Sequence, residues 1–267
     1  MRELERELPG QRGEPRSLAI VGAGRVGASL AGAAGDAGLA VTVAGREDAL
    51  DACRAADAAL LCVPDSAIAE ACRAVAAAVP PLSFVGHTSG ATTLAPLSPA
   101  RARGAQAFSL HPLQTFPDGE TAVSGTPCAV AGSSPNATEF AASLARTLGM
   151  APFEVAEERR AAYHAAATIA SNLLVALEES AAGLLERAGV EDARELLAPL
   201  VLRTAANWAE RGPAALTGPI ARGDEETLQR HRAALAELAP ELAPLYEELA
   251  ERARAVKGAT ERGEVRA

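Results

Sequence analysis

The stretch Leu18-Ala-Ile-Val-Gly-Ala-Gly-Arg-Val-Gly27 decides the fold of this chain. A short apolar run breaks into three glycines at the G-x-G-x-x-G spacing, and a segment without helix breakers follows as far as Ala37. This pattern is typical of the first strand, phosphate-binding turn and first helix of a dinucleotide-binding sheet. Gly22 permits the tight turn, Gly24 lets the backbone approach a pyrophosphate, and Gly27 lets helix and strand pack closely. The alternative is a glycine turn in an unrelated α/β unit.

The end of the second expected strand, Ala40 to Val43, bears on the choice of cofactor. An acid at that position selects a free ribose 2′-hydroxyl, whereas an arginine accommodates a 2′-phosphate. Arg46 therefore favours NADP over NAD, unless Arg46 is a solvated turn residue and Glu47 or Asp48 contacts the ribose instead. The expected cofactor-binding residues are Gly22, Ala23, Gly24, Arg25, Val26, Gly27, Arg46, Val63, Pro64 and Thr88.

Composition limits the classes of function. The net charge of -9 and the low pI of about 5.1 argue against nucleic acid as a general partner, because no basic stripe is available for phosphates. We expect neither a membrane-spanning helix nor a signal peptide, and we expect a cytoplasmic protein. The four cysteines form no C-x-x-C pair, and no metal-binding spacing is present, so we expect buried thiols and no metal site.

The predicted fold class is α/β, with an N-terminal Rossmann-type doubly wound parallel sheet and an all-α C-terminal domain. The expected divisions are a flexible arm over 1–16, the sheet domain over 17–154, the helical domain over 155–256 and a polar tail over 257–267. Strands are expected around 18–21, 40–43, 57–63, 83–90, 107–116 and 128–131. Helices are expected around 25–37, 66–79, 136–148, 163–172 and 191–211, with a further helix capped by Asp224.

Polar side chains gather where ligands bind in open parallel sheets, at the carboxyl ends of strands. His87 and Ser89 follow the fourth strand, and His111 ends the fifth, where Pro112 holds it in extended backbone. We interpret His87 as a strand-end histidine with a satisfied hydrogen bond. Nucleophilic catalysis by Ser89 would need an adjacent base and an acidic group to orient that base.

Further along the chain, His164, Thr168 and Asn172 recur at four-residue spacing within one expected helix. Side chains at that spacing share a helix face, so the three polar groups are expected on one side among alanines. A histidine can donate a proton near neutral pH, and an asparagine can orient a carbonyl or a carboxylate. The alternatives are a structural histidine and an interhelical hydrogen bond.

Three signatures connect the chain to a known family. They are His111-Pro-Leu-Gln-Thr-Phe116, the helix from Tyr163-His164 to Ser171-Asn172, and Thr217-Gly-Pro through Arg222-Gly-Asp224. With them, the chain from about 17 to 255 resembles proteins that pair a Rossmann-like domain with C-terminal domain of unknown function 2520. That family is similar to ketopantoate reductase, pyrroline-5-carboxylate reductase and 6-phosphogluconate dehydrogenase-like enzymes. The resemblance implies NAD(P)-dependent chemistry on small acids in a cleft between the two domains.

The resemblance also implies roles for single residues. His164 stands where ketopantoate reductases carry a catalytic lysine, Asn172 matches one of their asparagines, and Gly90 matches a glycine beside the nicotinamide. The only lysine in this chain is Lys257, so histidine has replaced it as proton donor or the chemistry differs. The expected function is NADP-dependent oxidation or reduction of a 2-keto acid or a cyclic imino acid, and the alternative is a non-catalytic NADP-binding sensor or accessory protein. The candidate catalytic residues are His164, Asn172, Thr168, His111 and Ser89.

Two apolar runs in the helical half suggest a partner. The segments from Ile169 to Leu177 and from Leu196 to Leu202 are more apolar than one small bundle needs to bury. We therefore expect a homodimer formed through the helical domain.

Overall fold

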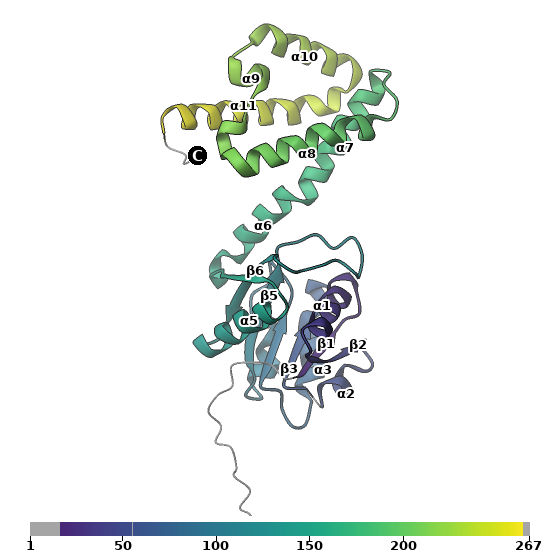
Figure 1. Ribbon diagram of the computed structural model, residues 1–267, viewed down its shortest axis with the longest axis vertical. Helices are drawn as coiled ribbons and strands as arrows, with labels where there is room; N and C mark the ends of the chain where they lie inside the picture. Colours follow the sequence, from purple (N-terminus) through teal and green to yellow (C-terminus); the bar gives the residue numbers. More distant parts are fainter. Residues whose placement is uncertain (1–16, 55, 264–267) are drawn as a thin grey trace, which may run out of the picture. The chain divides into compact units, whose positions relative to one another are not determined.

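The computed structural model describes residues 17–54 and 56–263 (Figure 1). The expected arm over 1–16 lies outside the described residues. Two compact units divide the chain, the first ending at Ile169 and the second beginning at Ala170. The sequence predicted this division at 154/155. Because the structure divides the chain after Ile169 instead, the helix that carries His164 belongs with the sheet rather than with the helical unit.

A seven-stranded sheet forms the centre of the first unit, in the order β2-β1-β3-β4-β5-β6-β7. All neighbouring strands run parallel except β5 and β6, which are antiparallel. The predicted α/β sheet is confirmed, with two departures, since β6 reverses direction and β7 was not expected. An antiparallel neighbour can be reached through a loop, whereas a parallel one needs a crossover, and the segment between β5 and β6 contains no helix. The strands are β1 Ser17–Val21, β2 Ala40–Ala44, β3 Ala58–Leu61, β4 Phe84–His87, β5 Gln106–Pro112, β6 Pro127–Gly132 and β7 Ala151–Glu154.

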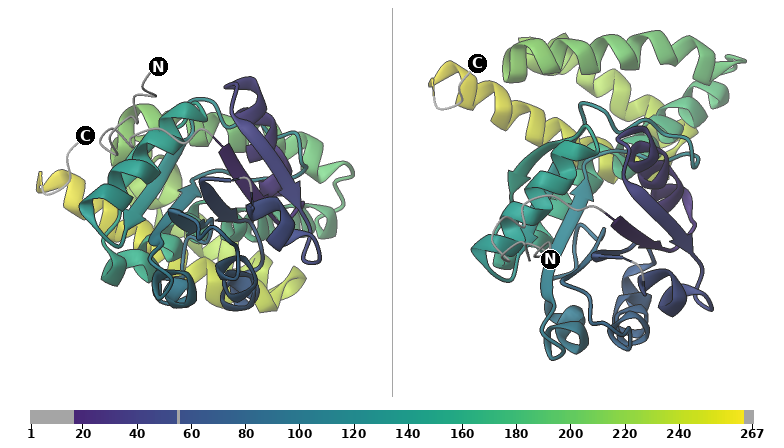
Figure 2. Two further views of the ribbon diagram at one scale, coloured as in Figure 1. Left: turned by 90° about the horizontal axis from the view of Figure 1, so that it is seen from below. Right: turned by 60° about the horizontal axis from the view of Figure 1, so that its bottom comes forward.

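Helices cover both faces of this sheet, as a doubly wound fold requires (Figure 2). One buried cluster includes Leu30 of the first helix and Phe140 of the fifth, and the other includes Ile68 of the third. Ser134 caps the fifth helix, because its hydroxyl accepts a hydrogen bond from the amide of Ala137. The helices of this unit are α1 Arg25–Asp36, α2 Ala49–Cys53, α3 Ile68–Ala76, α4 Ser98–Arg101, α5 Pro135–Thr147 and α6 Arg160–Ala170, with short 3₁₀ turns at Asp65–Ala67, Ala95–Leu97 and Glu157–Arg159.

In its described residues, the second unit contains helices and turns and no strand. Asp224 caps α10 as expected, since its carboxylate accepts a hydrogen bond of 3.1 Å from the amide of Thr227. The first residues of the expected polar tail over 257–267 are helical, because α11 continues to Glu261 and Lys257 pairs with that residue at 3.5 Å. The helices are α7 Asn172–Arg187, α8 Ala193–Arg211, α9 Gly218–Arg222, α10 Glu225–Leu238 and α11 Ala243–Glu261, with 3₁₀ turns at Gly212–Ala215 and Pro240–Leu242.

A helix break at Ser171 corrects one prediction that matters for the site. The backbone of Ser171 has φ -128° and ψ -81°, so α6 ends at Ala170 and α7 begins at Asn172. The four-residue spacing keeps side chains on one face only while the helix continues. The expected single face of His164, Thr168 and Asn172 is therefore interrupted, and Asn172 lies on the next helix.

The same region is apolar enough to raise the question of a membrane. Among the described residues, one helical stretch, Glu157–Arg187, passes by length and composition as a span, with a mean hydropathy of 1.2. This is weak evidence, because helices of water-soluble proteins have the same properties. Ser171 divides the stretch, and the buried Arg160 near its start bonds to residues of the sheet.

Candidate functional site

The glycine turn after β1 combines two glycines required by packing with one that leaves open space. A Cβ on Gly22, whose φ is 114°, would lie 2.3 Å from the carbonyl oxygen of Cys62, and one on Gly27 would lie 1.9 Å from the carbonyl oxygen of Gly22. A Cβ on Gly24 would meet nothing within 4 Å. Gly24 therefore leaves the backbone open to a group from outside the protein.

The start of α1 suits an anion. Gly24 is the N-cap and offers no side chain, and the first intrahelical bond to reach it comes from the amide of Ala28 at 2.8 Å. The amides of Arg25, Val26 and Gly27 precede that bond and have no intrahelical acceptor. Together with exposed Ala23, they form the cradle in which a pyrophosphate binds at a helix N-terminus. The residues present thus fit the phosphate part of a dinucleotide.

A cavity of 140 Å³ adjoins this turn. Gly22, Val63 and Pro64 line it together with Arg46 and Glu70. The Arg46 guanidinium pairs with the Glu70 carboxylate at 3.2 Å, and the Arg46 side chain is 77% exposed. The cavity therefore brings together four of the predicted nucleotide contacts, Gly22, Arg46, Val63 and Pro64, and it places an acid that the sequence did not single out beside the arginine.

Thr88 lies apart from this cavity. Its hydroxyl donates to the carbonyl of Leu61 at 3.5 Å, between β3 and β4. Nearby, the Cys62 thiol has a pKa raised to about 12 by burial, against which a hydrogen bond with Thr88 acts. Thr88 thus ties two strand ends together.

Ser89 is held by its neighbours at the carboxyl end of β4. Its hydroxyl donates to the Asp65 carboxylate at 2.8 Å and accepts from the amide of Thr92 at 2.9 Å. The Thr92 hydroxyl donates to the same Asp65 oxygen at 3.0 Å. The Asp65 carboxylate thus ties the turn after β3 to the loop after β4. The Ser89 hydroxyl is buried, it donates one hydrogen bond and accepts another, and its catalytic role stays a prediction.

His87 confirms its interpretation as a strand-end histidine with satisfied hydrogen bonds. It is fully buried, its Nδ1 accepts from the amide of Ser89 at 3.2 Å, and its Nε2 lies 3.1 Å from the carbonyl of Thr93. These partners assign the proton to Nε2. Burial lowers the pKa of His87 to about 4, so the ring is neutral at pH 7. With Nδ1 engaged by an amide, His87 is no base for Ser89.

His111, Tyr163 and His164 form a cluster between β5 and α6. His111 Nδ1 lies 2.7 Å from the Tyr163 hydroxyl, and the centroids of the His111 and His164 rings are 5.9 Å apart. Burial lowers the pKa of His111 to about 4, with smaller contributions from His164 and Arg160, and burial raises the pKa of Tyr163 to about 12. At neutral pH the His111 ring is therefore neutral, and its tautomer decides whether the Tyr163 hydroxyl donates or accepts in this hydrogen bond.

Gly90 closes this cluster from the side of β4. A Cβ on Gly90 would lie 2.5 Å from His164 Cδ2 and 2.7 Å from His111 Nε2. The missing side chain thus allows both rings to lie against the backbone of the loop. The glycine carried over from the resemblance stands beside the two histidines predicted for the site.

Arg160 holds α6 against the sheet, and sequence reasoning missed it. Its side chain is fully buried, one Nη donates to the Ser109 hydroxyl at 2.8 Å, and the other donates to the carbonyl of Ser89. The Glu157 carboxylate accepts from the amide of Leu94 at 2.8 Å and raises the pKa of Arg160, while burial lowers it more strongly. The sequence did hold a signal for Arg160, because this arginine lies one helical turn before His164 in an alanine-rich helix.

The two remaining predicted residues, Thr168 and Asn172, follow His164 along the chain. Thr168 is half-buried in the last turn of α6. Asn172 is exposed at the start of α7, and its Oδ1 accepts a hydrogen bond of 3.2 Å from the Ser171 hydroxyl.

Cysteines and metal ligands add little to the site. All four cysteines are free thiols, and burial raises the pKa of Cys53 to about 11 and that of Cys128 to about 12. Within the part of the chain that the structure describes, no group of three or more histidine, cysteine or acidic side chains could hold a metal ion.

Comparison with known families accounts for both halves of the chain. Residues 44–112 match the family described as Rossmann-like domain, and residues 126–253 match the domain of unknown function DUF2520. This chain joins a Rossmann-like domain to a DUF2520 domain. The resemblance inferred from the three sequence signatures is confirmed. The DUF2520 match begins at the end of the loop before β6, so it includes the last strands of the sheet and the helix that carries His164.

Solved structures share the fold of this Rossmann–DUF2520 chain. A Bacteroides fragilis protein, provisionally named an NADP oxidoreductase, is 23% identical with a TM-score of 0.74, over 90% of this chain and 98% of that one. A Thermotoga maritima protein is 21% identical with a TM-score of 0.74, over 91% and 99%. Reductive aminase from Aspergillus terreus, in complex with NADPH and ethyl-5-oxohexanoate, is 20% identical with a TM-score of 0.63, over 93% and 94%. No curated protein matches this chain.

Proposed function

We propose that this protein is an NADP-dependent oxidoreductase acting on a small carboxylate such as a 2-keto acid or a cyclic imino acid. The observation that carries the proposal is the cluster of His111, Tyr163 and His164 around Gly90, on the sheet whose first strand ends in the glycine turn. Ligands bind at the carboxyl ends of strands in such sheets. The names of structurally similar proteins, which include NADP or NADPH, support the cofactor.

In this proposal the amides of Arg25, Val26 and Gly27 bind the pyrophosphate, and Arg46 binds the 2′-phosphate. Bound NADPH supplies the hydride. Glu70 competes for Arg46, because the two side chains pair at 3.2 Å. NADP binding therefore requires Arg46 to exchange or share that partner, and NAD remains an alternative in which Glu70 accepts from a ribose hydroxyl.

Reduction of a carbonyl or an imine also requires a proton donor and a group that polarises the substrate. With its pKa near 4, His111 is neutral at neutral pH; in this proposal the Tyr163 hydroxyl donates to its Nδ1, and its Nε2–H donates a hydrogen bond to the substrate. His164, half-buried beside it, is the proton donor in this proposal. Asn172 orients the substrate carboxylate, a role that rests on the resemblance alone.

A second candidate is a non-catalytic NADP sensor or accessory protein. It is favoured by the absence of a lysine at the place of His164 and by the full engagement of the Ser89 hydroxyl. It does not explain why two histidines and a tyrosine face one another beside a glycine that their rings need. We therefore favour the enzyme.

The test is NADPH oxidation by the purified protein with a panel of 2-keto acids and cyclic imino acids, run beside titration of NADPH and NADH. Saturable turnover that falls in His164→Ala, with NADPH affinity retained, supports the oxidoreductase. NADPH binding without turnover of any substrate in the panel favours the sensor. Absence of NADPH and NADH binding contradicts both candidates.

We also propose a homodimer formed through the second unit, in the cytoplasm. Large apolar side chains on α7 and α8 are exposed, among them Val175 at 64%, Leu202 at 71% and Trp208 at 66%. Exposed apolar side chains in this number mark an interaction surface. A second copy of the chain offers the same surface in return, as a two-fold interface requires.

A further inference from the structure

The cavity beside the glycine turn holds one acid and one base, and they come from segments that meet only in the folded chain. Arg46 follows β2, and Glu70 lies in the first turn of α3. The two side chains pair at 3.2 Å, from Arg46 Nη1 to Glu70 Oε1. Among the described residues that line the cavity, no other side chain carries a charge. This pair therefore sets the electrostatic character of the cavity.

The end of β2 lies directly beside the glycine turn. The amide of Gly22 donates to the carbonyl of Ala44 at 2.8 Å, and Arg46 follows two residues later. In dinucleotide-binding sheets the adenosine ribose lies at this strand end, where an acid bonds to the ribose hydroxyls and an arginine accommodates a 2′-phosphate. The cavity offers both kinds of side chain, so it can contact either form of the ribose.

The acid in this cavity is not one of those next to the arginine in the chain. Glu47 and Asp48 follow Arg46 directly, but neither is among the described residues that line the cavity. Glu70 lines it instead, from the helix after β3. Because β3 is next to β1 in the sheet, the segments that follow the two strands leave the same edge. The acid that can reach the ribose is thus supplied by α3.

The pair of Arg46 and Glu70 contributes little to the fold. Their side chains are 77% and 59% exposed, and exposed ion pairs add little to stability. Glu70 is also favourable without Arg46, because a carboxylate in the first turn of a helix interacts well with the helix dipole. A phosphate, to which a guanidinium can donate two parallel hydrogen bonds, can therefore displace Glu70 from Arg46 at small cost.

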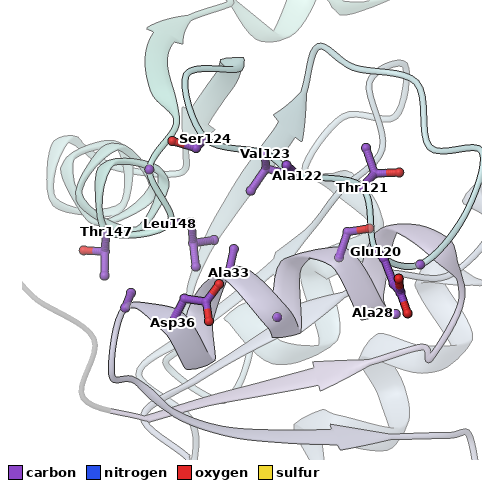
Figure 3. A pocket seen from close by; sticks show the side chains of 15 residues that line it. Ala28, Ala33, Asp36, Glu120, Thr121, Ala122, Val123, Ser124, Thr147 and Leu148 are labelled. Carbon is purple, nitrogen blue, oxygen red and sulfur yellow. The ribbon is translucent and has the colours of Figure 1, made fainter.

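A second hollow on the first unit lacks this combination of charges. The groove of 540 Å³ along α1 is lined by two acids, Asp36 and Glu120, and by no arginine or lysine among the described residues (Figure 3). Two carboxylates repel the phosphates of a dinucleotide and offer them no cation. Of these two hollows, the cavity with Arg46 is the one that suits a 2′-phosphate.

We propose that Glu70 is a specificity-determining residue that makes the site accept both NADPH and NADH. With NADPH, Arg46 leaves Glu70 for the 2′-phosphate, and the carboxylate that stays nearby weakens the binding of this phosphate by repulsion. With NADH, Arg46 stays paired, and Glu70 accepts a hydrogen bond from a ribose hydroxyl. The inference rests on the proposed function, because it needs a dinucleotide at the glycine turn.

The test is calorimetric titration of the full chain with NADPH and with NADH. Glu70→Gln should raise the affinity for NADPH roughly threefold or more without raising that for NADH, and the gain should shrink as added salt screens the exposed charge. Glu70→Ala should raise the affinity for NADPH as well, and it should lower that for NADH about threefold or more, because it removes the acceptor. Loss of stability would change both affinities together, so the ratio of the two isolates the role of Glu70.

Glu47→Gln is the matched control, since it removes the same charge beside Arg46 from a residue outside the cavity lining. Its ratio of NADPH to NADH affinity should equal that of the parent. In the Arg46→Ala background, Glu70→Gln should raise NADPH affinity less than it does in the parent, because no guanidinium is left to compete for.

Four results would overturn the inference while NADPH binding persists. They are an unchanged affinity ratio in Glu70→Gln, an equal change in Glu47→Gln, an equal gain with and without Arg46, and a parent that binds NADPH more than about a hundredfold more tightly than NADH. Absence of binding of either cofactor would contradict the proposed function itself, and this inference with it.

Discussion

Replacement of Arg160 by methionine tests whether a buried cation holds α6 on the sheet. The change removes the hydrogen bonds to the Ser109 hydroxyl and the Ser89 carbonyl, and it leaves the Glu157 carboxylate without the nearby positive charge. Hydrogen bonds to charged groups contribute about 1.5–3 kcal/mol each. We expect Arg160→Met to lower the free energy of unfolding of the first unit by about 3–5 kcal/mol.

The assay is urea denaturation followed by the fluorescence of a probe on the first unit, because the only tryptophan, Trp208, lies in the second unit. Arg159→Met is the matched control, since Arg159 is the exposed neighbour. The double variant Arg160→Met with Glu157→Gln should recover part of the loss, because it also removes the half-buried Glu157 charge, which Arg160→Met leaves without its nearby cation. Arg160→Met as stable as Arg159→Met, or no recovery in the double variant, would refute the argument.

Four further predictions follow from the site and the exposed surfaces. His164→Ala should lower turnover by roughly 10²–10⁴-fold, the range for a lost acid-base group, with NADPH affinity retained, and Asn172→Ala should raise KM more than it lowers kcat. Steady-state kinetics and melting temperatures check both variants. Loss of stability with unchanged activity per folded molecule would contradict both roles. Arg46→Ala should weaken NADPH binding by about 1.5–3 kcal/mol more than NADH binding. Equal losses of affinity for the two cofactors in calorimetry would contradict the role of Arg46 at the 2′-phosphate. The pKa of His111 is lowered to about 4 in the folded protein, so between pH 4 and its ordinary value of 6.5 the unfolded chain binds more protons than the folded one. The His111 contribution to stability is therefore complete above this pH range and is lost as the pH falls through it. In urea titrations at several pH values, the free energy of unfolding of His111→Gln should depend less steeply on pH than that of the parent, and identical slopes would contradict the neutral ring. Leu200→Glu, at a side chain that is 63% exposed, should shift a dimer to monomer in sedimentation equilibrium, whereas a parent protein that is already monomeric at micromolar concentration would exclude the dimer.

The parts of the fold that sequence reasoning predicted are those in which short-range chemistry decides. Gly22 must adopt φ 114°, and Gly27 must lie against Gly22, so the glycine spacing specifies the turn with little help from the remainder of the chain. Alternating buried strands and amphipathic helices likewise show their period within a few residues. The cap at Asp224 belongs to this class, since its partner Thr227 is three residues away. His87 and His111 were found because strand ends can be located from the same local pattern.

Long-range contacts decided the rest. The antiparallel pairing of β6 with β5 depends on a connection over 113–126 that contains no crossover helix and on the contacts that hold the returning strand against β5. The Ser89 hydroxyl is engaged by Asp65, a residue 24 positions away, so its hydrogen bond could not be predicted from its own neighbourhood. The break at Ser171 separated Asn172 from the helix of His164, although the residue types there continue a helical pattern.

Arg160 shows the physical reason most clearly. An arginine on a helix is ordinarily solvated, because burying its charge is costly unless hydrogen bonds compensate. Here the compensation comes from Ser109 and Ser89, 51 and 71 residues earlier in the chain. Local patterns carry the preferences of backbone and side chain over a few residues, whereas partners for a buried charge exist only once distant strands have been brought together.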